Sequence, residues 1–120
     1  MGSGRRDSRK PSREERREEA LRPCAGLGYD RDSLAVYFLE REMFALAEAQ
    51  LRRAVWLNPF EAAFKNHLAW CLYRQDKFLE AREWAQKALG QKDEPNTRDL
   101  LELVERKLKG QTGRNQTVQK

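Results

Sequence analysis

Apolar residues recur through the middle of the chain with the spacing of amphipathic helices. Leu34, Ala35, Phe38 and Leu39 follow the i, i+1, i+4, i+5 pattern of one helical face. Similar helical spacing returns in later segments, and we find no segment that indicates a strand. The pattern therefore predicts an all-α fold with four helices between residues 28 and 95 and a fifth after them. The apolar faces of the later helices comprise Phe44, Ala47, Leu51, Ala54 and Val55; Phe64, Leu68, Ala69 and Leu72; Phe78, Ala81, Ala85, Ala88 and Leu89; and Leu100, Leu101, Leu103, Val104 and Leu108.

The predicted helices fall into one register of 34 residues, which divides the chain into repeats 28–61 and 62–95. Leucine, phenylalanine and alanine return at the same places of each repeat. A self-match at a fixed period indicates a repeat array, in which each unit is a supersecondary piece stacked on the next. Alanine lets neighbouring helices approach to about 8–10 Å without the backbone cost of glycine. The matching pairs are Leu34 and Leu68, Ala35 and Ala69, Phe44 and Phe78, Ala47 and Ala81, and Ala54 and Ala88.

This register resembles the tetratricopeptide repeat, a helix–turn–helix unit of the same length. The resemblance covers residues 28–95, and residues 96–109 follow as a capping helix with one polar face, which suits the end of an array. It implies an antiparallel helix–turn–helix array, a fragment of an α-solenoid. Because proteins of this family usually hold other proteins, the resemblance also implies an interaction module, a small adaptor or a scaffold similar to a co-chaperone.

Two departures from the family pattern concern the turn inside each repeat and the core of the second repeat. The family usually has glycine in this turn, whereas this chain has Glu42 and Asp76. Aspartate tolerates a left-handed backbone better than glutamate does, so we expect the first turn to be reshaped or its helix end to shift by one residue. Ala85 stands where a larger residue is usual, and we expect Trp84 beside it to supply the volume.

Capping residues predict where the helices begin. We expect Asp30 or Asp32 to cap the first helix, because short polar side chains accept hydrogen bonds from the free amides of a first turn. The Asn58-Pro59 pair suits the start of the third helix, with proline at the first helical position. The Pro95-Asn96 pair likewise ends one helix and begins the last.

The basic residues gather at the two ends of the chain, whose net charge is +5. Residues 1–22 carry 8 basic and 5 acidic residues, residues 109–120 carry 3 basic and no acidic residues, and residues 23–108 carry 13 and 14. We expect 1–27 to be a largely disordered basic tail with a short charged helix over 12–21, and 110–120 to be a second disordered basic tail. An alternative function follows, in which the tails associate with nucleic acid or an anionic membrane surface.

In the family that this chain resembles, the first helix of each repeat lines a concave surface. At the matching places, Trp70 and Tyr73 offer broad apolar area with a polar edge, as binding hot spots do. Asn66 and Arg74 suit the orientation of an extended peptide or an acidic group. The alternative for Trp70 is packing against the last helix, and a further alternative for the chain is self-association through the exposed end of the stack. The candidate partner-binding residues are Val36, Leu39, Asn66, Trp70, Tyr73 and Arg74.

The sequence offers little catalytic chemistry. His67 and Cys71 lie four residues apart and share one face of a predicted helix, a spacing that can begin a nucleophilic pair or a metal site. The sequence has no second histidine or pair of cysteines to complete such a site, so we expect no enzyme activity, no cofactor and no metal. Two cysteines are too few for a disulfide framework, and the N-terminus has no apolar run, so we expect a reducing, cytoplasmic location.

Overall fold

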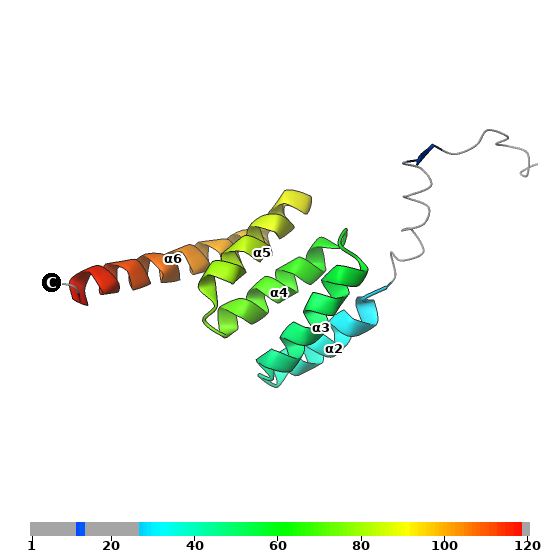
Figure 1. The fold of residues 1–120 in the computed structure, drawn as a ribbon, viewed down its shortest axis with the longest axis horizontal. Coiled ribbons are helices and arrows are strands. Elements are labelled where there is room, and N and C mark those ends of the chain that lie inside the picture. The colour runs from blue at the N-terminus through cyan, green and yellow to red at the C-terminus, as the bar shows by residue number, and fades with distance from the viewer. Residues whose placement is uncertain (1–11, 14–26, 119–120) are drawn as a thin grey trace, which may run out of the picture.

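The computed structural model describes residues 12–13 and 27–118, with side chains to Gln111, and within this part the fold is all-α, as predicted. Figure 1 shows the helices following one another across the molecule. The predicted N-terminal tail and its short helix lie outside the described residues, apart from residues 12, 13 and 27. The helices are α2 (Tyr29–Glu40), α3 (Phe44–Leu57), α4 (Ala62–Arg74), α5 (Phe78–Gln91) and α6 (Pro95–Val118).

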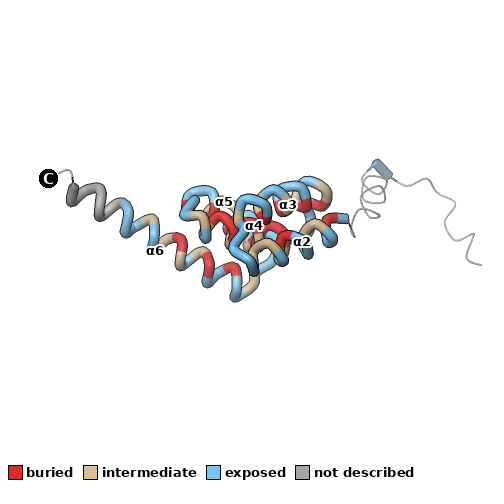
Figure 2. Tube along the Cα trace, turned by 90° about the horizontal axis from the view of Figure 1, so that it is seen from below, coloured by how far each residue is buried: buried red, intermediate tan, exposed pale blue. Residues whose placement is uncertain are grey.

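Two antiparallel hairpins, α2–α3 and α4–α5, pack side by side, and α6 packs on α5 (Figure 1). The helix α4 lies at the centre, since it contacts α2, α3, α5 and α6. Most of its residues are buried, among them Phe64, Leu68 and Leu72, which are fully enclosed. Figure 2 shows the buried positions concentrated where the helices face one another. The core is therefore built around α4.

The second hairpin repeats the first at an offset of 34 residues. The bounds of α3 and α5 differ by this number at both ends. The turns also match: the amide of Met43 donates to the Phe38 carbonyl at 2.8 Å, and the amide of Lys77 donates to the Leu72 carbonyl at 2.9 Å. The register that the sequence predicts is therefore present in the backbone hydrogen bonds.

The turn at Glu42 keeps the shape of the turn at Asp76, contrary to the expectation of a reshaped turn. Glu42 has φ 58° and Asp76 has φ 63°, both in the left-handed region. The amide of Glu42 donates to the Leu39 carbonyl at 3.0 Å, as Asp76 donates to Tyr73 at 3.0 Å. Glutamate thus adopts a conformation that costs an L-residue about 1–2 kcal/mol, because the packing of both helices fixes the turn.

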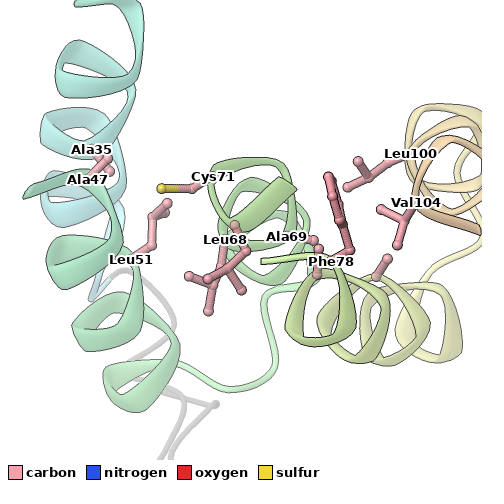
Figure 3. Packing of buried hydrophobic residues seen from close by; sticks show 12 residues of the cluster. Ala35, Ala47, Leu51, Leu68, Ala69, Cys71, Phe78, Leu100 and Val104 are labelled. Carbon is pink, nitrogen blue, oxygen red and sulfur yellow. The ribbon is translucent and has the colours of Figure 1, made fainter. Parts of the chain in front are cut away.

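Alanines lie at the helix crossings, as the repeat register predicts. Six of them are at most 1% exposed, and larger residues fill the spaces between the crossings. Figure 3 shows Leu51 and Cys71 between α3 and α4, and Leu100 and Val104 of α6 directed toward Phe78. Ala85 is also fully buried, and Trp84 beside it packs against the core as expected. The six alanines are Ala35, Ala47, Ala54, Ala69, Ala81 and Ala88.

The starts of α2 and α4 differ from the capping residues that the sequence predicts. Gly28, with φ 94°, precedes α2 in place of an aspartate cap. A Cβ there would lie 2.7 Å from the Phe64 ring, so the close approach of α4 requires glycine. Asn58 ends α3 and accepts a hydrogen bond from the amide of Phe60 at 3.3 Å, whereas α4 begins only after Glu61. The Asn58-Pro59 pair therefore forms the turn between α3 and α4.

The last helix begins at Pro95, which has no amide to leave unpaired in a first turn. Leu100 and Val104 are fully buried against the stack, so the predicted capping face is confirmed. The helix continues to Val118, past the predicted end at residue 109, and the predicted tail 110–120 begins inside it. Two glycines lower helix propensity here by about 1 kcal/mol each, but no proline interrupts the hydrogen-bond ladder.

The left-handed turn at Glu42 gives a stability prediction. Glu42→Gly should raise the free energy of unfolding by about 0.5–1 kcal/mol, because glycine adopts this φ without a steric penalty that outweighs its entropy cost. Asp76→Gly should gain less, since aspartate tolerates the left-handed region better. Chemical denaturation measures both.

Glu83→Gly is the matched control, because Glu83 lies inside α5 with helical geometry. This control should lose about 1 kcal/mol. A loss of stability in Glu42→Gly comparable to that of the control would show that the turn carries no strain.

Candidate functional site

Two of the candidate groove residues are bound to the first turn of α6. The side-chain amide of Asn66 donates to Asn96 Oδ1 at 3.0 Å and accepts from the Thr97 hydroxyl at 3.0 Å. The indole N–H of Trp70 donates to the same Asn96 oxygen at 2.8 Å. Asn66 is only 8% exposed. Its amide therefore positions α6 against α4, and it is not on the surface that the sequence analysis assigned to a ligand.

Trp70 and Tyr73 form a fixed aromatic pair. Their ring centroids lie 5.9 Å apart at an interplanar angle of 90°, an edge-to-face arrangement. Tyr73 also contacts the Phe78 ring at 5.7 Å. Both aromatic side chains are half-buried and pack against the core. Trp70 therefore meets both descriptions that the sequence left open: it is bound to the capping helix through its N–H and keeps part of its surface exposed.

The remaining candidate residues lie toward the first hairpin. Val36 and Leu39 of α2 are half-buried, and Leu39 packs against the core. Arg74 is exposed, and its guanidinium lies 4.9 Å from the centre of the Phe44 ring at the start of α3. No carboxylate in the described part of the chain forms an ion pair with Arg74. The structure thus brings Trp70 and Tyr73 together, and leaves Arg74 available to an acidic group.

His67 and Cys71 engage different partners despite their shared helix. His67 Nδ1 lies 2.6 Å from Asp32 Oδ1 on α2. The Cys71 thiol is buried and donates to the Phe44 carbonyl at 3.2 Å. Burial raises the pKa of Cys71 to about 11, so the thiol stays protonated at neutral pH, whereas nucleophilic attack and metal binding need the thiolate. Among the described residues, no three His, Cys, Asp or Glu side chains are grouped to hold a metal ion.

The sequence analysis missed a charged network between the hairpins. Glu48 of α3 accepts from Gln75 Nε2 at 2.9 Å, Lys77 Nζ at 3.1 Å and Arg52 Nε at 2.8 Å. Arg52 also donates to Glu80 of α5 at 3.0 Å. Burial acts to raise the pKa of Glu48, but these three hydrogen bonds outweigh it and lower the pKa. The network therefore fixes the second hairpin on the first.

Comparisons with models of protein families and with curated proteins found no match to this chain. Within the part of the chain that the structure describes, no helix combines the length and the apolar composition that crossing a membrane requires.

The Glu48 network predicts a pH-dependent contribution to stability. Because the pKa of Glu48 in the folded state lies below 4.5, its charged form stabilises the fold above that pH, and the contribution is lost as the pH falls through the folded-state pKa. Glu48→Gln should therefore lower the free energy of unfolding by about 1–2 kcal/mol at pH 7, since a hydrogen-bonded charge is removed. Its difference from wild type should shrink below about pH 4.

Glu102→Gln is the control, because Glu102 forms an exposed ion pair with Arg106. This change should shift the free energy of unfolding by less than about 0.5 kcal/mol at pH 7. Denaturant titrations at both pH values measure these differences. An undiminished difference for Glu48→Gln in acid would contradict the role given to its charge.

Proposed function

We propose that this protein is an interaction module that binds a protein segment on the face formed by α2 and α4. The observation that carries the proposal is the Trp70–Tyr73 pair. Its orientation is fixed by the hydrogen bond to Asn96 and by the core beneath it, yet part of each ring is exposed. An anchor that is already ordered loses little conformational freedom on binding, which favours affinity.

The repeat architecture supports the same proposal. The offset of 34 residues between α3 and α5 and the matching turns are what a tetratricopeptide-like array would have. We include membership of that class in the proposal, together with a non-enzymatic role as an adaptor or scaffold. A reducing compartment such as the cytoplasm suits the free thiol of Cys71.

The chemistry around the aromatic pair defines the kind of segment that fits. An apolar side chain would pack on the exposed parts of Trp70 and Tyr73, and Val36 on the neighbouring α2 would extend the apolar surface. An acidic group would suit Arg74, which has no carboxylate partner among the described side chains. We therefore propose a segment that carries an apolar anchor and an acidic residue. Association of the basic tails with nucleic acid or anionic lipid stays the alternative.

A selection from a peptide library against the full chain tests this proposal. Selected peptides should combine an apolar and an acidic residue. Trp70→Ala and Tyr73→Ala should each weaken their binding roughly thirtyfold, because the loss of a central aromatic anchor costs about 2 kcal/mol. Trp56→Ala is the matched control, since Trp56 is 69% exposed and lies on α3, outside the proposed face.

Circular dichroism first establishes that each variant is folded. Binding by folded Trp70→Ala and Tyr73→Ala at wild-type strength would exclude the α2–α4 face, and a loss confined to Trp56→Ala would move the site to α3. Failure to select any peptide that depends on the aromatic pair would also contradict the proposal.

A further inference from the structure

The repeat offset identifies which residues face the open end of the stack. In the second hairpin, Leu68 and Cys71 of α4 are fully buried and lie toward the first hairpin. On α5, Lys77 and Glu80 reach across to the first hairpin and pair with Glu48 and Arg52. The corresponding places on α2 and α3 point the same way along the stack, where no preceding hairpin is described.

Those corresponding places hold four apolar residues. Leu34 is 41% exposed, Tyr37 47%, Met43 42% and Leu46 47%, and we call these four residues the open-end patch. Two of them replace charged residues, because Met43 and Leu46 stand where the second hairpin has a lysine and a glutamate. The patch is therefore more apolar than the internal surface to which it corresponds, which is typical of an interaction surface.

Neither end of this chain has the side chains to cover the patch. One repeat before Ala47, Leu51 and Ala54, which α3 packs inward, the sequence has Arg13, Arg17 and Ala20, and burying two arginines would be costly. The outer face of α6 exposes charged residues, so a second copy stacked head to tail would place them on apolar side chains. These charged residues are Arg98, Glu102 and Arg106.

The charges on α2 are arranged for a second copy that runs in the opposite direction. Asp30, Leu34, Tyr37 and Arg41 follow the spacing i, i+4, i+7, i+11 and share one face of α2. Asp30 and Arg41 are both exposed, and no described residue forms an ion pair with either. Arg41 lies over the Tyr37 ring, 3.7 Å from its centre, at the edge of the patch.

We propose that the open-end patch is the interface of a symmetric homodimer. A two-fold axis through the middle of α2 sets Leu34 of one copy against Tyr37 of the other. The same operation brings Asp30 of each copy to Arg41 of its partner, so one surface complements itself. The interface buries the apolar patch of both copies and pairs four charges at its rim.

Sedimentation velocity of the full chain from about 1 µM to about 200 µM tests the dimer, since small interfaces associate in the micromolar range. Wild type should convert from monomer to dimer across this range. Tyr37→Glu and Leu46→Glu should each weaken dimerisation at least tenfold. Leu79→Glu should leave it unchanged, because Leu79 is 61% exposed but lies on α5, outside the patch.

A charge exchange tests the antiparallel arrangement separately. Arg41→Asp alone and Asp30→Arg alone should each weaken the dimer, because like charges then meet at both ends of the interface. The double variant should recover most of the lost affinity. A wild-type chain that stays monomeric, assemblies that grow beyond two copies, or single exchanges that have no effect would each overturn the proposal. Circular dichroism confirms that every variant keeps its helix content.

Discussion

Neighbouring helices lie close together in this protein because alanines occupy the places where they cross. A larger side chain at any of these places would push two backbones apart, and the alanines are at most 1% exposed. Close crossings on both sides of α4 give this helix most of the buried residues of the molecule. The position of Trp70 and Tyr73, and the direction in which the open-end patch faces, both follow from this packing.

Polar contacts then fix how the closely packed parts are rotated relative to one another. Glu48 joins the two hairpins through Gln75 and Lys77, and Asn66 joins α4 to α6 through Asn96. Hydrogen-bonded groups at such positions contribute specificity, because a slipped arrangement would leave them buried and unpaired. The same contacts order the surface around Trp70, so the stability of the stack and its proposed binding face depend on one set of residues.

The sequence predicted what depends on the period alone. Helix identity, the repeat offset and the buried alanines all follow from spacings within one repeat, and the structure has them. The turn at Glu42 was misjudged, because the intrinsic preference of one residue gave way to the packing of two helices. The caps at Asp30 and Asn58 were misjudged for a related reason: the approach of Phe64 to Gly28 and the turn at Asn58 decide where those helices begin.

The partners of Asn66 and Trp70 lay beyond reach because they depend on the placement of α6. Pro95 lies two places later than the repeat register requires, so the rotation of α6 against α4 does not follow from the offset. Only the structure shows that Asn96 receives both donors. The burial of Asn66 follows from this contact, and it leaves the aromatic pair and Arg74 as the core of the candidate site.

The free energy of unfolding of Ala47→Leu, compared with that of Ala49→Leu, tests the close crossings most directly. Both alanines lie on α3, but Ala47 is fully buried at a crossing and Ala49 is exposed. Overpacking should cost Ala47→Leu about 1–3 kcal/mol, whereas Ala49→Leu should stay within about 0.5 kcal/mol of wild type. Equal unfolding free energies for the two variants would contradict the packing on which the whole account rests.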